Sequence, residues 1–264
     1  MKPFPGLPFR IGTTSYIIPE EILPNVRFLA GLVEDVELVL FDFADATNNY
    51  PPEAALVEMK ALAQQAGLTY TVHLPLDLRL CAQDGQPHAS MLKARQVIQL
   101  TQTLDPWAYV AHLDGHAERL SSDPAVLQAW NDQAVRALET VAGWAGGADH
   151  LAVENLETYP LHFWDDVLRR APVSCCVDIG HLWLDGHDPL PFLAGRLART
   201  RVLHIHGRGE RDHQPLSHVP TDELARVLAY LVQVDYRGVL TLEIFGEDDL
   251  RGSMQAMQTA LARL

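Results

Sequence analysis

Apolar and polar positions follow two alternating patterns along the chain. Short runs of aliphatic, β-branched and aromatic residues are separated by longer stretches in which apolar residues recur at helical spacing. The short runs leave little room for a polar face, which is typical of strands buried on both sides. They predict eight strands, at residues 10–16, 36–42, 69–74, 107–113, 150–155, 173–178, 201–206 and 238–245.

The longer stretches predict helices at 51–67, 123–146 and 221–233, with a first helix near 20–32. The 51–67 stretch opens with a proline pair and ends on Gly67, the usual signals for a helix start and stop. Eight strands, each followed by a helix, predict an α/β fold closed as a (β/α)8 TIM barrel, with one domain over residues 1–264. A doubly wound open sheet is the alternative, but "GTTSYIIP" after the first strand is not a glycine-rich phosphate turn.

Composition narrows the classes of function. No apolar run approaches the roughly 20 residues needed to span a bilayer, and "MKPFPGLPFRIG" lacks the apolar region of a signal peptide. The three cysteines do not form a disulfide framework, so we expect a cytoplasmic protein without a membrane partner. The formal net charge of −14 repels polyanions unless one face is locally basic, which disfavours nucleic acid as a partner.

The predicted strands end in ionisable residues from the second strand onward. In a barrel these ends converge on one rim, where active sites form. Taken singly, each residue is more often a helix cap, an ion-pair partner or a structural histidine. Together they would bury many charges and imidazoles, at a cost of several kcal/mol per group unless something compensates. The residues are Asp42, His73, His112, Glu154, Asp178, His204 with His206, and Glu243.

Divalent metal ions are the compensation that suits this set of side chains. Nitrogen and oxygen donors without thiolate favour Zn, Mn, Fe or Co over Ca or Mg. In "VDIGH", a loop after Asp178 is expected to fold back and bring His181 to the same cluster. His204 and His206 are two apart on a strand and share a face, so one is expected to bind metal and the other to support it or contact substrate.

The motifs "VHL", "AHL", "VEN", "VDIGH", "LHIHG" and "LEIF" resemble those of the xylose-isomerase-like TIM barrels, which include sugar isomerases, epimerases and the endonuclease IV group. The resemblance to ketose epimerases implies one metal ion, held by Glu154, Asp178, His204 and Glu243. The resemblance to endonuclease IV implies three, with His73, His112, His181 and a histidine after strand seven as further ligands.

Aligning "GERDHQPL" on its leucine makes His213 that last histidine. The family's aspartate lies two residues before the histidine, whereas Asp212 is adjacent to His213, so whether Asp212 is a ligand stays open. Arg208 and Arg211 of the same loop, together with His206 at the end of the preceding strand, are expected to contact substrate. Solvated loop charges are the alternative for the two arginines.

A narrower resemblance covers residues 9–42, which are similar to the opening of the cobamide-remodelling phosphodiesterases. It implies hydrolysis of the phosphodiester in the nucleotide loop of a cobamide, giving cobinamide phosphate and a base riboside. Two or three divalent ions, zinc first among them, would serve this reaction, with Glu154 and Glu243 as the catalytic carboxylates. The alternatives are a single-metal sugar isomerase or epimerase that uses the same two glutamates as acid and base, an abasic-site endonuclease, and an inactive binding barrel.

Overall fold

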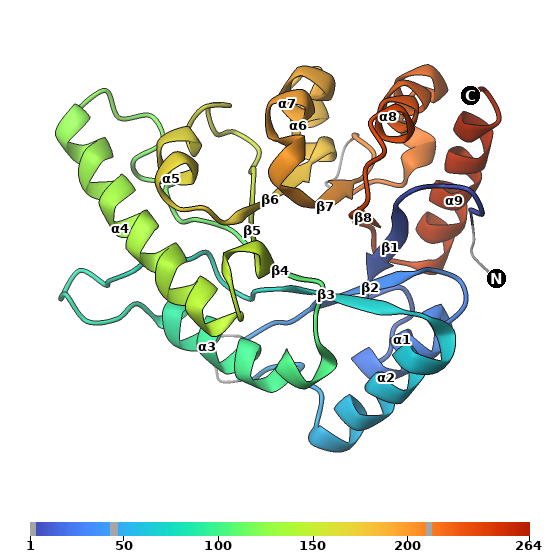
Figure 1. The fold of residues 1–264 in the computed structure, drawn as a ribbon, viewed down its shortest axis with the longest axis horizontal. Helices are drawn as coiled ribbons and strands as arrows, with labels where there is room; N and C mark the ends of the chain where they lie inside the picture. The colour runs from blue at the N-terminus through green and yellow to red at the C-terminus, as the bar shows by residue number, and fades with distance from the viewer. Residues whose placement is uncertain (1–3, 43–46, 210–212) are drawn as a thin grey trace.

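A computed structural model describes residues 4–42, 47–209 and 213–264. Its eight strands are all parallel and close into a barrel in chain order, with β8 paired to β1, which confirms the predicted TIM barrel (Figure 1). The strands are β1 (Arg10–Thr14), β2 (Asp35–Val39), β3 (Thr69–His73), β4 (Ala108–Ala111), β5 (Leu151–Glu154), β6 (Ser174–Asp178), β7 (Thr200–Ile205) and β8 (Val239–Leu242).

Helices surround the strands as an outer layer (Figure 1). They are α1 (Ile22–Leu29), α2 (Glu53–Ala66), α3 (Ala89–Thr101), α4 (Pro124–Trp144), α5 (Asp165–Arg170), α6 (Ile179–Leu184), α7 (Pro189–Arg196), α8 (Thr221–Gln233) and α9 (Glu247–Leu261). Short 3-10 turns lie at Gln102–Leu104, Ala148–His150, Leu197–Arg199 and Leu216–His218. None of the described helices has the length and apolar character needed to cross a membrane.

Local chemistry explains where the helices begin and end. Asp123 caps α4 by accepting a hydrogen bond from the backbone N–H of Ala125 at 2.8 Å, and Pro124 occupies the first helical position, where a missing N–H costs nothing. Gly67 directly follows α2 and caps it, with a φ of +68° in the left-handed region that favours glycine. The predicted helices therefore begin and end within a few residues of their expected positions.

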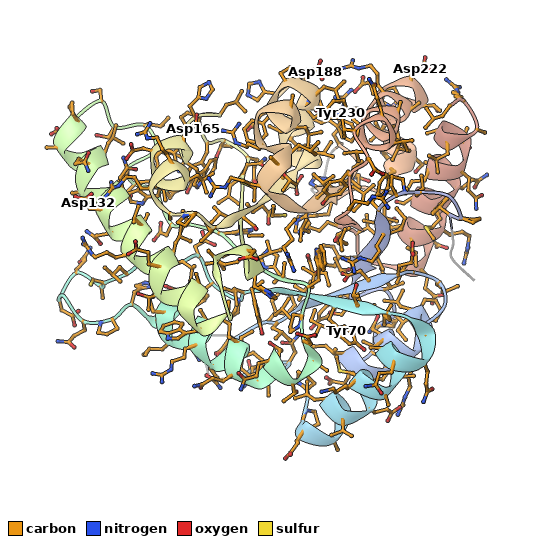
Figure 2. All side chains as sticks on the ribbon, in the orientation of Figure 1. Tyr70, Asp132, Asp165, Asp188, Asp222 and Tyr230 are labelled. Atoms are coloured by element: carbon orange, nitrogen blue, oxygen red, sulfur yellow. The ribbon has the colours of Figure 1, made fainter. Side chains whose placement is uncertain are left out.

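Apolar side chains fill the space between the barrel and the helices (Figure 2). Tyr70 of β3 is one of them, and its hydroxyl donates to the carbonyl of Met59 in α2 at 2.7 Å. A separate, smaller apolar cluster comes from alternate residues of β4 to β7. It contains Ala108, Val110, Ala152, Cys176 and Val202. Because side chains alternate across a strand, this second cluster faces the barrel interior and packs it below the rim.

Candidate metal centre

The ionisable side chains at the rim continue the inward-facing rows of the strands. Glu154, Asp178 and His204 each lie two residues beyond a member of the interior cluster. Strand periodicity therefore turns all three toward the barrel axis. His73 ends β3, while His112 and Glu243 directly follow β4 and β8. The predicted convergence of these residues at one rim is what the structure contains.

The central group consists of Glu154, Asp178, His204 and Glu243, all buried, with one ligand atom from each within 4.8 Å of the others. His204 Nδ1 lies 3.0 Å from Glu243 Oε2 and 3.4 Å from Glu154 Oε1. Asp178 also caps α6 by accepting the N–H of His181 at 2.7 Å. His181 therefore comes from the first turn of a helix, and not from a loop as predicted, because the chain turns helical directly after β6.

A second group shares Glu154 with the central one. His73 and His112 direct their Nε2 atoms at Glu154 Oε2, at 3.6 and 3.3 Å. The three residues again meet the distance requirement for a common cation. Glu154 is 1% exposed and has histidines near both carboxylate oxygens, because His181 and His204 lie beside Oε1.

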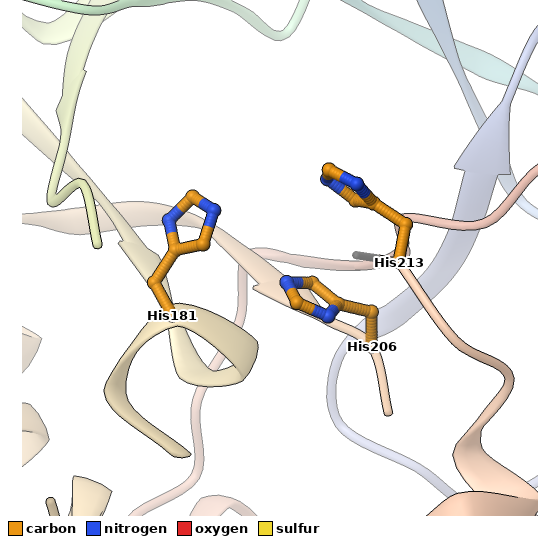
Figure 3. A group of neighbouring side chains, drawn as sticks. All are labelled: His181, His206 and His213. Atoms are coloured by element: carbon orange, nitrogen blue, oxygen red, sulfur yellow. The ribbon is translucent and has the colours of Figure 1, made fainter. Parts of the chain in front are cut away.

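A third group contains only imidazoles, from His181, His206 and His213. Figure 3 shows the three rings facing one another from α6, the end of β7 and the loop that follows. His206 was predicted to contact substrate, and the structure places it between the other two. Its ring centroid lies 5.5 Å from that of His181 and 4.7 Å from that of His213.

Five of these imidazoles are each held by one ring nitrogen. A ring nitrogen that faces a carbonyl or carboxylate oxygen donates its proton there, which leaves the other nitrogen of a neutral ring with a bare lone pair. The anchoring contacts are His73 Nδ1 to Leu74 O (3.0 Å), His112 Nδ1 to Asp77 Oδ1 (3.1 Å), His181 Nδ1 to Asn155 O (2.9 Å), His204 Nε2 to Glu37 Oε2 (2.9 Å) and His206 Nδ1 to Gly207 O (2.9 Å). The second nitrogen of each ring faces a carboxylate oxygen at 3.0 to 3.6 Å, so a bound cation would take the place of a proton there.

The electrostatics of the rim reflect its concentration of acids. Burial alone would lower the pKa of His112, but the charge of Glu154 and the hydrogen bond to Asp77 outweigh it and raise this pKa to about 10. Burial likewise opposes the charges of Asp178 and Glu154 around His181, whose pKa rises to about 9. The protein thus recruits positive charge to this rim, and divalent cations can supply it in place of protons.

Four buried atoms test whether the residues fit metal ions. Within the described part of the chain, Asp178 Oδ2, His204 Nδ1, His206 Nε2 and Glu243 Oε2 make no hydrogen bond of acceptable geometry, although His204 Nδ1 and Glu243 Oε2 lie 3.0 Å apart. A buried polar atom left in this way costs about 1–3 kcal/mol. All four belong to the groups above, and all are donors that zinc-like cations accept. The donor set therefore fits divalent cations.

The rim also contains a cavity of about 260 Å³. Its lining includes the second group, Val39 at the end of β2, and Leu40 and Phe41, which follow that strand. Ligand cavities usually measure about 300–1,000 Å³, so this one suits the reacting part of a substrate better than a large molecule. A larger cavity of about 580 Å³ lies at the opposite end of the barrel, and its lining contains no histidine.

Some predicted residues lie away from this cluster. Asp42 pairs with Lys93 at 2.5 Å and accepts the hydroxyl of Tyr50 at 2.8 Å, so of its two predicted roles it has the structural one. Arg208 pairs with Glu223 of α8 at 3.0 Å. Arg211 and Asp212, together with the question of whether Asp212 is a ligand, lie outside the described residues.

Two residues of the site were missed by sequence reasoning. Glu37 of β2 is fully buried and accepts a hydrogen bond from His204 Nε2 at 2.9 Å. Asn155 joins β5 to β6, because its side-chain oxygen accepts the N–H of Asp178 and its side-chain nitrogen donates to the carbonyl of the same residue. A carboxylate between the apolar residues Val36 and Leu38 was the available signal for Glu37. Asn155 had no signal beyond its place after Glu154.

The comparisons with known proteins cover almost the whole barrel. The model of the xylose isomerase-like TIM barrel family matches residues 33–264. No curated protein matches the chain. Among solved structures, the fold is similar to that of a D-tagatose 3-epimerase-like protein, at 17% identity and a TM-score of 0.74 over 97% of this chain and 98% of the other.

The fold is also similar to that of the 3-keto-D-glucoside 4-epimerase of E. coli (16% identity, TM-score 0.70, 96% and 99% covered). Endonuclease IV from Thermus thermophilus is a further neighbour (18% identity, TM-score 0.67, 97% and 100% covered). These identities are low, so the likenesses concern the fold alone, whereas the family match covers most of the sequence. The chain belongs to the xylose isomerase-like TIM barrel family.

Proposed function

We propose that this protein is a metal-dependent phosphodiesterase that hydrolyses the nucleotide-loop phosphodiester of a cobamide. Glu154 belongs to two ligand groups at once, and this observation supports the hydrolytic part of the proposal. Two cation positions that share a carboxylate are a common arrangement in enzymes that hydrolyse phosphate esters. A single-metal reaction uses the central group and leaves His73 and His112 without a role.

The chain's own residues have distinct tasks in this proposal. Glu154, Asp178, His204 and Glu243 would hold one cation, and His73 and His112 would hold another together with Glu154. Bound divalent cations, zinc first among them, supply charge neutralisation at the phosphate oxygens and lower the pKa of water.

Glu243 is the carboxylate best placed to orient the attacking water. It follows β8, is 8% exposed, and directs Oε1 to within 3.5 Å of His213 Nε2. The water oxygen bonds to phosphorus while the bond to the ribose oxygen breaks. The ribose oxygen takes up a proton and leaves as the riboside, and the phosphate stays on the aminopropanol arm.

The cobamide itself is supported by the resemblance of residues 9–42. In the structure this segment forms β1, α1 and β2, and the residues that follow β2 line the rim cavity. The net charge of −14 also favours a small-molecule substrate over a long polyanion. The cavity of about 260 Å³ would take the phosphate and its neighbouring groups while the corrin stays outside.

A sugar epimerase is the second candidate, favoured by the names of the structural neighbours. In that case the central group would hold one cation, and Glu154 and Glu243 would exchange protons on either side of a ketose carbon. An abasic-site endonuclease is the third, since endonuclease IV shares the fold.

One set of incubations tests the three. Metal-loaded protein is mixed separately with an adenosylated cobamide, a ketohexose and an oligonucleotide carrying an abasic site, and the products are identified by mass spectrometry. Cobinamide phosphate and a riboside are expected from the cobamide. His112→Ala is expected to abolish this activity, whereas the matched His162→Ala, at a side chain that is 83% exposed, is expected to retain it. Ketose epimerisation with no cobamide cleavage would refute the proposal.

A further inference from the structure

A second cavity, of about 670 Å³, lies between the loops that follow β3 and β4. Its volume is within the range of about 300–1,000 Å³ that is usual for ligand sites. Apart from two alanines, its lining is polar. The polar residues are Arg79, Gln83, Asp84, His88, Asp114 and His116.

The backbone connects this cavity to the rim cavity at the metal centre. Beyond the ends of β3 and β4 the two segments pair again, because Leu78 and Leu113 form a parallel bridge. Both leucines are buried, at 2% and 0% exposure. Since side chains alternate along an extended segment, the residues before and after each leucine share the opposite face.

Two pairs of side chains occupy that face. Asp77 Oδ1 lies 3.1 Å from His112 Nδ1, and both residues line the rim cavity. Two residues further along each segment, a step of roughly 7 Å, Arg79 Nε donates to Asp114 Oδ2 at 2.8 Å, and both line the larger cavity. The two cavities therefore follow one another along one face, and a ligand held at the cations can extend from the first into the second.

The wall of the larger cavity is already shaped. Residues 74–88 connect β3 to α3 and form a longer connection than the usual 4–6 residues or so. This segment folds back on itself through an antiparallel bridge between Cys81 and Pro87. At its end, His88 Nδ1 accepts the N–H of Ser90 at 3.2 Å and caps α3. Long loops that keep a defined shape are usually functional.

The lining offers hydrogen-bond donors as well as acceptors. His88 accepts at Nδ1 from Ser90, and Nδ1 of His116 faces the guanidinium of Arg119. A neutral imidazole that accepts at Nδ1 carries its proton on Nε2, so each ring has a donor left. The side-chain amide of Gln83 adds both a donor and an acceptor.

The charge and shape of the lining exclude two kinds of ligand group. Asp84 and Asp114 supply two carboxylates against the one guanidinium of Arg79, which disfavours an anion. The lining residues, all of them described, include no phenyl, phenol or indole ring on which a nucleobase could stack. Neutral groups that both donate and accept hydrogen bonds fit this cavity best.

We propose that the larger cavity binds the amide-bearing periphery of the corrin. This inference rests on the proposed function. The scissile phosphodiester lies between the aminopropanol arm of the corrin and the riboside, so a cobamide bound at the cations extends in two directions. The carboxamides of the corrin match the mixed donors and acceptors of the lining, whereas the aromatic base of the riboside does not. The cavity then sets the affinity for the corrin and takes no part in the chemistry.

Filling the cavity tests the proposal. Ala117 lines it and is exposed, so Ala117→Trp occupies the space and removes no polar group. Ala66→Trp is the matched control, because Ala66 is the exposed last residue of α2, at the opposite end of the barrel. Cobinamide, the corrin without its nucleotide, is coloured, and equilibrium dialysis against metal-loaded protein gives its Kd directly. The base riboside is the comparison ligand.

Ala117→Trp is expected to bind cobinamide at least about tenfold more weakly than wild type, as overfilling a packed site does. Ala66→Trp is expected to match wild type, and all three proteins to bind the riboside equally. Gln83→Ala, at an exposed loop position, removes one hydrogen-bonding group and is expected to weaken cobinamide binding by about 2- to 10-fold. It serves as the second variant if Ala117→Trp does not fold, as judged by circular dichroism.

The inference is overturned if folded Ala117→Trp binds cobinamide as tightly as wild type, or if its affinity for the riboside falls instead. Wild-type cobamide cleavage with an unchanged KM in Ala117→Trp would reject the cavity assignment and leave the proposed function standing. Wild-type protein that neither cleaves cobamide nor binds cobinamide would reject the function, and the corrin site with it.

Discussion

Replacing Glu37 with glutamine removes one buried negative charge behind the central metal group and changes almost nothing else. Glu37 is 0% exposed, and its Oε2 accepts the Nε2 proton of His204 at 2.9 Å. Glutamine has the same shape and can still accept that hydrogen bond through its carbonyl. The substitution therefore isolates the contribution of the charge to the basicity of His204 Nδ1.

The expected magnitude follows from the distance. At 2.9 Å a carboxylate and a full imidazolium charge attract by roughly 6 kcal/mol at an effective dielectric constant of 20. A metal-bound imidazole carries only part of a unit charge, so the loss is a fraction of this. Carboxylates that hold metal-binding histidines typically contribute about 10–100-fold in metal affinity, or roughly 1.4–2.8 kcal/mol. We expect Glu37→Gln to weaken the central site by that factor.

Competition with a coloured chelator measures this affinity for wild type, Glu37→Gln and a control. Glu139→Gln, at an exposed position on α4, is the matched control because it removes the same charge far from the rim. A thermal unfolding scan of the metal-free proteins separates an effect on folding from one on binding. If Glu37→Gln lowers the unfolding temperature but leaves the cation affinity unchanged, the reasoning is wrong and Glu37 is only a structural partner.

Three further predictions concern other buried polar groups. Burial raises the pKa of Asp35 from its ordinary 3.8 to about 6. The protonated Asp35 carboxyl therefore stabilises the folded state fully below pH 3.8, and this contribution is lost by about pH 6. In denaturant titrations, the free energy of unfolding of Asp35→Asn should therefore rise by about 3 kcal/mol relative to that of wild type between about pH 4 and pH 7. A gap that does not change with pH would contradict this. Asn155→Ala leaves the backbone N–H and carbonyl of Asp178 without partners and should cost about 1–3 kcal/mol in the unfolding of metal-free protein. An unchanged free energy of unfolding would show that Asn155 does not stabilise the backbone of Asp178. Because Asp42 pairs with Lys93, Asp42→Asn should not change the number of bound ions in an elemental assay. The loss of an ion would show that Asp42 is a metal ligand.

The barrel could be predicted because its signals are local. Each strand is a short apolar run and each long helix carries its own start and stop residues, so alternation alone indicates a (β/α)8 fold. The ends of the strands were predicted less closely than their positions along the chain. The run predicted to end at Asp42 stops at Val39, since the chain leaves the sheet there and Asp42 pairs with Lys93 instead.

The candidate site was predictable to the extent that strand ends converge in a barrel. His73, Glu154 and Asp178 end their strands, and knowledge of the fold is enough to place them together. The role of Glu37 was not predictable in this way, because it depends on an interior contact between β2 and β7, strands that are not adjacent in the sheet.

The amino-acid sequence by itself determined the class of fold, the excess of acids and the identity of the donors that reach one rim. Periodicity and composition are properties of neighbours along the chain, and they need no coordinates. Tertiary structure alone decided how those donors divide into groups, which nitrogen of each ring is anchored and which carboxylate belongs to two groups. These depend on distances of a few ångströms between residues up to 167 positions apart, as between Glu37 and His204, and such distances arise only when the barrel closes.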